Sequence, residues 1–287
     1  MGILTDVFLP ISLAFIMFSM GLALVLDDFK RVVLQPKAFA VGLVTQMLLL
    51  PAVALALASV WPIEPVLAVG IMILAACPSG VTSNLLTHLA KGDTALAVSL
   101  TAVNSVAHVV TIPFVVNLAL AISMGKTEAV SLSVGGTILS VFLITTVPVA
   151  IGMAVRHRAA GFADRFEPIA RGIATVLFIV IVLGAIAAER ANLGRYFSES
   201  GPIALTLNVI MMGVGFYAAR LFSLNRRQGI AIAIESGVQN STLAIFVATT
   251  LLGDTRLAIP GAIYGLLMFI TAGAFVLTMR SRAAKAA

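Results

Sequence analysis

Residues 79–84 read Ser-Gly-Val-Thr-Ser-Asn, and residues 236–241 read Ser-Gly-Val-Gln-Asn-Ser. A second pair of related strings follows them in the same order, Gly-Asp-Thr-Ala-Leu-Ala at residues 92–97 and Gly-Asp-Thr-Arg-Leu-Ala at residues 253–258. The strings at 79–84 and 236–241 each interrupt a long apolar run with glycine and small polar residues. Paired, polar-broken segments in the two halves of a hydrophobic chain indicate the binding site of a secondary transporter.

The composition assigns the chain to a lipid bilayer. Of its 287 residues, 60% are hydrophobic and 10% are charged, and the mean hydropathy is +1.11, whereas a soluble domain carries about 25% charged residues. The apolar runs are long and continuous, which favours spanning helices over the alternating strands of a β-barrel. The net charge of +6 fits basic loops that set topology, so we expect no nucleic-acid partner.

A helix needs about 20 apolar residues to cross a bilayer. We therefore predict an all-α polytopic membrane protein, a single unit over residues 1–287, with nine transmembrane helices. The predicted spans cover residues 7–26, 38–60, 66–90, 95–122, 131–155, 168–188, 201–221, 229–251 and 257–279.

The basic residues predict the orientation of these spans. With the N-terminus outside, 14 of the 18 Lys and Arg residues fall on the cytoplasmic side, as the positive-inside rule requires. We predict a multi-pass protein of the inner cell membrane with its N-terminus outside and its C-terminus in the cytoplasm. The repeated strings then lie in helices of opposite direction, which predicts an inverted-topology repeat of spans 1–4 and 6–9.

Glu235 is the one carboxylate that this topology places inside a span. An ionised side chain at mid-bilayer costs about 3 kcal/mol or more on insertion scales, so such a residue usually lines a cavity, pairs with a cation or binds an ion. No Lys or Arg lies at mid-span. The alternative is a protonated Glu235 that hydrogen-bonds a neighbouring helix.

The predicted surroundings of Glu235 are neutral oxygen donors, which suit a small hard cation better than a soft metal. Broken helices add free carbonyls, which can hold Na⁺, and free N–H groups, which can face an anionic substrate. For Gln46, a hydrogen bond between helices is an equally good interpretation. The candidate side chains are Gln46, Ser83, Asn84, Ser99, Thr101, Asn104, Ser236, Gln239, Asn240 and Ser241.

At these positions the chain resembles the bile acid:sodium symporter family, in stretches at residues 20–24, 77–84, 89–93 and 235–241. The resemblance extends from about residue 8 to residue 279. It implies two crossed discontinuous helices and two bodies, of which one moves against the other. The core domain would hold spans 3, 4, 8 and 9 (about residues 66–122 and 229–279), and the panel domain spans 1, 2, 5, 6 and 7 (about residues 7–60 and 131–221).

The resemblance also implies two Na⁺ sites and a substrate site. The first Na⁺ site would use Ser83, Asn84, Thr101 and Glu235. The second would use Gln46, Glu235, Gln239 and the backbone carbonyls of Ser236 and Val238. The expected substrate residues are Asn240, Val81, Thr82, Asn104 and Met268. The chain departs from the family pattern at Ala97, where a serine is common, and at Met268-Phe269, where bacterial relatives often have His-Asn.

The sequence thus predicts a sodium-coupled symporter that carries a small organic anion, a bile acid or another carboxylate, by alternating access and acts as a monomer. A proton-coupled carrier or exporter of the same fold, with Glu235 as the titrating group, is the alternative. An enzyme is disfavoured because no nucleophile–base pair or metal cluster is apparent. A receptor is disfavoured because the predicted inner loops are short.

Overall fold

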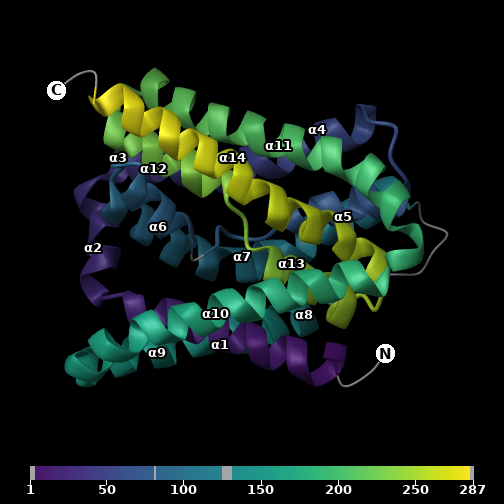
Figure 1. The fold of residues 1–287 in the computed structure, drawn as a ribbon, viewed down its shortest axis with the longest axis horizontal. Helices are drawn as coiled ribbons and strands as arrows, with labels where there is room; N and C mark the ends of the chain where they lie inside the picture. The colour runs from purple at the N-terminus through teal and green to yellow at the C-terminus, as the bar shows by residue number, and fades with distance from the viewer. Residues whose placement is uncertain (1–3, 81, 125–130, 285–287) are drawn as a thin grey trace.

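The computed structural model describes residues 4–80, 82–124 and 131–284, and this part of the chain is built of helices (Figure 1). Seven of its helices are long and apolar enough to cross a membrane. They cover Thr5–Ala23, Pro36–Val60, Thr94–Ser123, Val134–Arg158, Ala160–Ala188, Arg190–Leu221 and Thr255–Ser281. These seven coincide with seven of the nine predicted spans.

The labelled elements subdivide these helices where short π-helical or 3₁₀ turns interrupt them. In chain order they are η1 (Leu4–Phe8), α1 (Leu9–Ala23), α2 (Leu26–Leu34), α3 (Pro36–Val44), η2 (Thr45–Leu49), α4 (Leu50–Val60), α5 (Pro65–Ala75), α6 (Thr82–Leu89), α7 (Thr94–Ser123), α8 (Val134–Val141), η3 (Phe142–Thr146), α9 (Val147–Arg158), α10 (Ala160–Ala188), η4 (Arg190–Asn192), α11 (Leu193–Leu221), α12 (Arg226–Gly237), α13 (Ser241–Phe246), η5 (Val247–Leu251), η6 (Thr255–Ala258) and α14 (Ile259–Ala284).

The other two predicted spans, the third and the eighth, are each broken into two short helices. The third consists of α5 and α6, and the eighth of α12 followed by α13 and η5. Proline and glycine in the first break, and glycine in the second, stop the helices at the two repeated strings. Asn240 restarts the eighth span, because its side-chain oxygen accepts a hydrogen bond from the Leu243 N–H at 3.0 Å and so caps α13.

The two breaks cross and bond to each other through their backbones. The Asn240 N–H donates to the Pro78 carbonyl at 2.9 Å, and the Gly80 N–H donates to the Val238 carbonyl at 3.2 Å. Ser79 and Gln239 form an isolated antiparallel bridge between these bonds. Two unwound segments inside an apolar helix bundle thus satisfy part of each other's backbone polarity.

Other helices satisfy the end of α12 as well. The carbonyl of Gly237, the last residue of α12, accepts hydrogen bonds from the Tyr264 hydroxyl and the Asn208 amide, both at 2.7 Å. Both side chains are fully buried. These bonds fix the broken end of α12 against α14 and α11.

The helices form two layers. In the first, α1 packs against α9 and α10, and the backbones approach so closely that a Cβ on Gly21 would lie 2.2 Å from the Val149 carbonyl oxygen. In the second, α11 packs against α12 and α14, and α5 packs against α7. Figure 1 shows α1, α9 and α10 along one side and α11, α12 and α14 along the other. The seventh span, expected in the panel domain, here packs on two helices expected in the core domain.

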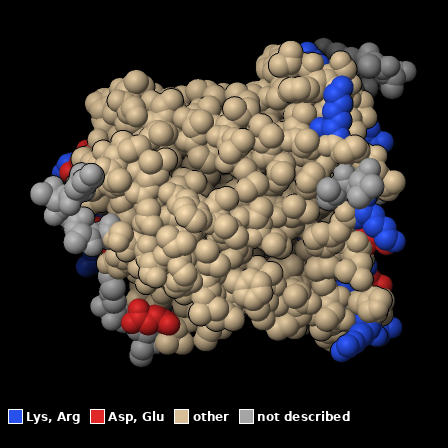
Figure 2. Space-filling model, turned by 180° about the vertical axis from the view of Figure 1, so that it is seen from behind, with Lys and Arg blue, Asp and Glu red and all other residues tan. Residues whose placement is uncertain are grey.

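A broad band of uncharged surface separates the two ends of the molecule (Figure 2). Many large apolar side chains are exposed, for example Ile270 and Leu277 on α14 and Val176 on α10. Lys and Arg gather at one end of the visible face. This distribution is that of a helix bundle whose middle contacts lipid and whose ends contact water.

Candidate functional site

Glu235 lies in the last turn of α12, two residues before its end, and only 2% of its surface is exposed. Its Oε2 accepts a hydrogen bond from Ser79 Oγ at 2.5 Å, and its Oε1 accepts a bond from the Ser83 hydroxyl. Thr101 Oγ1 lies 3.0 Å from Oε1 and 2.9 Å from Oε2. We refer to Ser79, Ser83, Thr101 and Glu235 as the carboxylate cluster.

The carboxylate cluster gathers oxygen atoms without a basic side chain. Among the described residues, Glu235 forms no salt bridge with a Lys, Arg or His, and no group of three or more His, Cys, Asp or Glu side chains is found. An ionised carboxylate buried in this way needs a cation or a proton. One carboxylate and three hydroxyls suit a small hard cation, because such ions prefer oxygen ligands.

A second group of polar atoms lies on the other side of the crossing. Gln46 Nε2 donates to Gln239 Oε1 at 2.8 Å, and Gln239 Nε2 donates to the Ser236 carbonyl at 2.9 Å. Gln46 Nε2 also lies 3.4 Å from the Cys77 carbonyl. We refer to Gln46, Gln239 and the carbonyls of Cys77 and Ser236 as the amide cluster. Gln46 lies in a π-helical turn, η2, and such turns occur frequently at functional sites.

The residues expected at the first Na⁺ site lie together. Ser83 and Thr101 contact the Glu235 carboxylate, and Thr101 Oγ1 lies 3.4 Å from Asn84 Oδ1. Ala97 lacks the hydroxyl of the serine that is common at this position in the family. Its backbone carbonyl accepts a hydrogen bond from Thr101 Oγ1 at 3.0 Å. Ser99 bonds instead to the carbonyls of Asp28 and Ala95.

The residues expected at the second Na⁺ site lie in the amide cluster, with two differences. The Glu235 side chain points into the carboxylate cluster, and only its backbone carbonyl, 3.5 Å from Gln239 Nε2, approaches the amides. The Val238 carbonyl already accepts a hydrogen bond from the Gly80 N–H, so that only one of its two lone pairs is left for an ion.

A cavity of about 370 Å³ lies between the two layers beside the crossing. Three of the expected substrate residues line it, Asn240, Thr82 and Met268. Asn104 does not line it; this side chain is fully buried on α7, and its backbone carbonyl contacts His108 Nδ1 at 2.7 Å. Val81, also expected there, lies outside the described residues. Most of the lining is apolar, including Met17, Met20, Leu85, Phe178 and Phe269.

The cavity touches both clusters. Asn84, which contacts Thr101, and Gln239, which bonds Gln46, also line the cavity wall. Asn84 thus lies between the cavity and the carboxylate cluster, and Gln239 lies between the cavity and the amide cluster.

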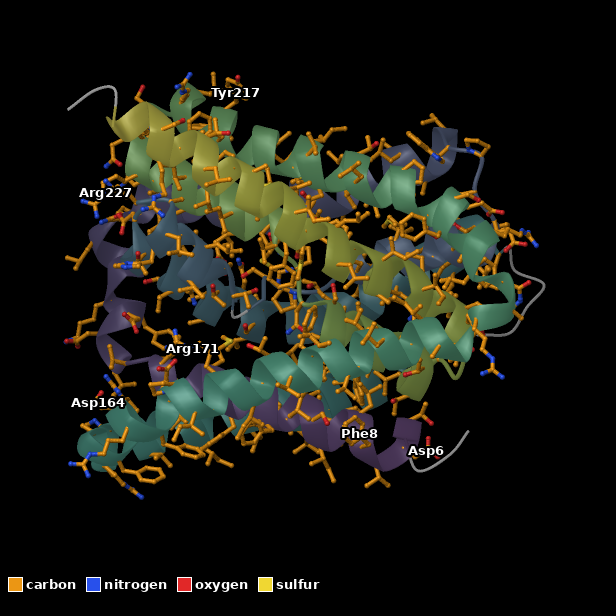
Figure 3. The ribbon with its side chains drawn as sticks, viewed as in Figure 1. Asp6, Phe8, Asp164, Arg171, Tyr217 and Arg227 are labelled. Carbon is orange, nitrogen blue, oxygen red and sulfur yellow. The ribbon has the colours of Figure 1, made fainter. Side chains whose placement is uncertain are left out.

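Two features of the site were not predicted from the sequence. The sequence does not distinguish Ser79 from the rest of its repeated string, yet its hydroxyl is one of the three that contact the Glu235 carboxylate. Arg171 is explained by the positive-inside rule as one of the basic residues near the cytoplasmic side, yet it lines the cavity and is the one basic residue among the described residues of the lining. Figure 3 shows Arg171 on the side of α10 that faces the other layer. Its partner is Glu167, one turn away at 3.3 Å, which also lines the cavity.

The fold and the site define a class: a helical membrane protein with two crossed, broken helices, a buried oxygen-rich cluster and an adjoining cavity. The profile of the Sodium Bile acid symporter family matches residues 10–196. An uncharacterised sodium-dependent transporter of Bacillus subtilis is 31% identical over 264 residues, which cover 90% of this chain and 78% of the relative. The chain belongs to the Sodium Bile acid symporter family.

Two plant relatives are longer than this chain. A probable chloroplastic sodium/metabolite cotransporter of Oryza sativa subsp. japonica is 27% identical over 97% of this chain and 65% of its own length. A probable chloroplastic sodium/metabolite cotransporter of Arabidopsis thaliana is 26% identical over 88% of this chain and 62% of its own length. The chain thus spans a little under two thirds of these two relatives.

Proposed function

We propose that this protein is a sodium-coupled symporter of a small organic anion that works by alternating access. The single observation that carries the proposal is the burial of Glu235, without a basic partner, among three hydroxyls at the crossing of two broken helices. The names of the relatives support sodium dependence.

In this proposal two Na⁺ ions bind, one in each cluster. Sodium in the carboxylate cluster neutralises Glu235, and sodium in the amide cluster replaces the hydrogen bonds between Gln46 and Gln239. The shared amides, Asn84 and Gln239, couple sodium binding to binding of the anion in the cavity, because each ligand orders a side chain that the other also contacts. Each charge that enters with the membrane potential contributes about 2.3 kcal/mol per 100 mV.

The largely apolar cavity with one arginine suits an anion with an apolar body, such as a bile acid or another carboxylate. Asn240 and Thr82 supply polar contacts at the crossing, beside the N-terminal ends of α13 and α6. Met268 and the neighbouring apolar side chains contact the body of the substrate.

The same proposal gives the chain nine spans, seven continuous and two broken, in an inverted-topology repeat. The N-terminus lies outside and the C-terminus in the cytoplasm of the inner membrane, and one copy of the chain suffices for transport. In this proposal the moving panel is smaller than the sequence suggested and consists of α1, α8, α9 and α10, because α11 packs far more extensively on α12 and α14 than α1 and α10 pack on α13. The cavity lies between this panel and the rest.

Replacing Glu235 by glutamine tests the proposal. We expect Na⁺ to raise the melting temperature of the wild-type protein in detergent and to raise that of E235Q much less, because only the amide cluster is then left to bind sodium. Glu199→Gln is the matched control, because Glu199 pairs with Arg195 far from the crossing. Full retention of the sodium-induced shift in E235Q would contradict the assignment.

Transport by the wild-type protein in proteoliposomes separates the sodium-coupled carrier from the proton-coupled alternative. At fixed pH, we expect uptake of a labelled organic anion to require an inward Na⁺ gradient. Uptake that follows a proton gradient without Na⁺ would assign Glu235 the role of a proton carrier instead.

A further inference from the structure

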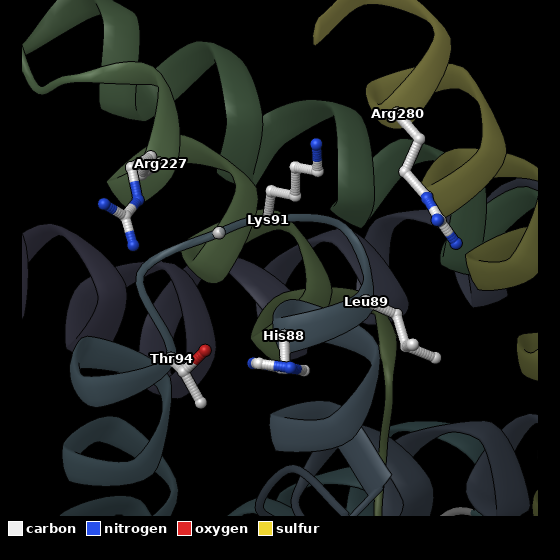
Figure 4. A pocket seen from close by; sticks show the side chains of 7 residues that line it. His88, Leu89, Lys91, Thr94, Arg227 and Arg280 are labelled. Atoms are coloured by element: carbon white, nitrogen blue, oxygen red, sulfur yellow. The ribbon is translucent and has the colours of Figure 1, made fainter. Parts of the chain in front are cut away.

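A second cavity, of about 650 Å³, lies at the end of the molecule where α6 ends and α7 and α12 begin. It is lined by three exposed basic side chains, Lys91, Arg227 and Arg280, which come from three different elements. Figure 4 shows Arg227 and Arg280 on either side of Lys91, with His88 and Leu89 below them. We refer to this hollow as the basic pocket.

The three cations of the basic pocket lack acidic partners. Among the described residues, none of them forms a salt bridge. The acid of the same loop, Asp93, caps α7 by accepting from the Leu96 N–H at 3.1 Å. Three like charges around one hollow repel one another, and an anion bound between them would offset this electrostatic repulsion.

Hydrogen bonds fix the elements that carry these cations to one another. The Asp93 N–H donates to the Arg227 carbonyl at 2.9 Å, which fixes the loop of Lys91 to α12. The Arg226 guanidinium donates to the Met279 carbonyl at 2.9 Å, which fixes the end of α14 beside the start of α12. Lys91 has φ = 57°, a left-handed conformation that a residue with a Cβ adopts at some cost. The backbone positions of the three basic residues are thus fixed relative to one another.

We propose that the basic pocket binds the phosphate of an anionic phospholipid headgroup. Basic pockets between membrane helices on the cytoplasmic side are suited to such headgroups. Leu89, which lines the pocket, is 42% exposed, and Leu277, one turn before Arg280 on α14, is 69% exposed. These apolar surfaces, next to the cations, favour a ligand with an acyl chain over a free phosphate. The site is separate from the cavity of the proposed carrier and does not depend on sodium coupling.

The experiment measures the melting temperature of the purified full-length protein in a zwitterionic detergent against increasing amounts of three probes. The probes are a short-chain phosphatidylglycerol, the phosphatidylcholine of the same chain length, and inorganic phosphate. We expect saturable stabilisation by phosphatidylglycerol alone. In Arg227→Gln/Arg280→Gln, the concentration for half the effect should rise at least tenfold, since two of three contacts to the phosphate are lost.

Arg158→Gln/Arg165→Gln is the matched control, because it removes two exposed arginines outside the basic pocket. It should stay within twofold of the wild type. If the first double variant does not fold, Arg280→Gln alone replaces it, with an expected threefold or larger loss. Stabilisation by inorganic phosphate to the same degree would overturn the lipid assignment in favour of a soluble anion. Equal effects of phosphatidylglycerol on the variant and the control would overturn the site itself.

Discussion

Thr101 Oγ1 contacts both carboxylate oxygens of Glu235, at 3.0 Å and 2.9 Å, so that one hydroxyl on α7 spans the only buried carboxylate in the described part of the chain. The same hydroxyl lies 3.4 Å from Asn84 Oδ1, at the wall of the cavity. Thr101 is therefore the residue that connects the proposed ion site with the proposed substrate site.

Replacing Thr101 by valine removes this hydroxyl and keeps the branched shape. We expect the apparent affinity for Na⁺ to fall about tenfold, equivalent to about 1.4 kcal/mol, because one oxygen ligand is lost. Thr249→Val is the control, since the buried Thr249 hydroxyl only bonds the Ile245 carbonyl within its own helix. Thermal shifts with increasing Na⁺ measure both variants, and an affinity unchanged in T101V would remove Thr101 from the ion site.

Ser79 is expected to contribute a further oxygen to the same ion, through the hydroxyl that lies 2.5 Å from Glu235 Oε2. Ser79→Ala should weaken Na⁺ binding about threefold to tenfold, a loss of the order of one hydrogen bond between neutral groups. Ser236→Ala is the matched control, because the Ser236 hydroxyl bonds the Ile232 carbonyl while its backbone carbonyl stays in the amide cluster. Equal apparent affinities for Na⁺ in S79A and S236A would count against a role for Ser79.

The positions of the two helix breaks could be predicted from the sequence for a local reason. Glycine, proline and small polar residues interrupt apolar runs at 78–84 and at 237–241, and helices end there whatever the rest of the chain does. Glu235 could also be predicted, because a carboxylate inside an apolar run is costly wherever it lies. These signals are short-range or compositional, and they need no knowledge of which helices touch.

The partners of α1 and α10 across the cavity could not be predicted in the same way. Arg171 lies near the end of a span and obeys the positive-inside rule, so the sequence gives it a sufficient explanation as a topology residue. Only the packing of α10 beside α1 and α13 brings it to the cavity. The place of α11 depends likewise on the close approach of Gly215 to α12, where a Cβ would lie 2.9 Å from the Ile232 carbonyl oxygen.

The pairing of Gln46 with Gln239 makes a separate prediction about the number of ions. Gln46→Leu removes the amide from the proposed second site and leaves the carboxylate cluster intact. We expect sodium-dependent uptake to change from a sigmoidal to a hyperbolic dependence on Na⁺ concentration, with the Hill coefficient falling from near two to near one. Gln228→Leu is the control, because Gln228 pairs with Gln35 near the start of α12, away from the crossing. A sigmoidal dependence in Q46L would contradict a sodium ion at the amide cluster.

Asn240 has two tasks, and one substitution separates them. Its Oδ1 caps α13, and the residue also lines the cavity. Asn240→Asp retains a capping oxygen but adds a negative charge, so we expect folding to be kept and the affinity for an organic anion to fall at least tenfold. Asn225→Asp, the same change at the exposed cap of α12, is the control. Binding of the anion at saturating Na⁺ measures the effect, and wild-type affinity in N240D would exclude contact with the anionic group.

Arg171 makes the last prediction, which concerns the choice of substrate. Among the described residues it is the one basic side chain that lines the cavity. Its pair with Glu167 is partly exposed, so little free energy is lost when the arginine turns to an anion. Arg171→Gln should lower the affinity for a carboxylate substrate about tenfold or more, and Arg171→Lys should restore part of it, because lysine keeps the charge but not the planar geometry.

Glu167→Gln distinguishes this role from a structural one. It breaks the same ion pair while leaving the arginine charged, so we expect substrate affinity to stay the same or to rise, since the arginine no longer has a competing carboxylate. If E167Q and R171Q weakened binding equally, the pair would act by holding α10 in place, and the arginine would have no direct contact with the transported anion. The Na⁺-induced thermal shift should be the same in both variants as in the wild type, because neither residue contacts the carboxylate cluster or the amide cluster.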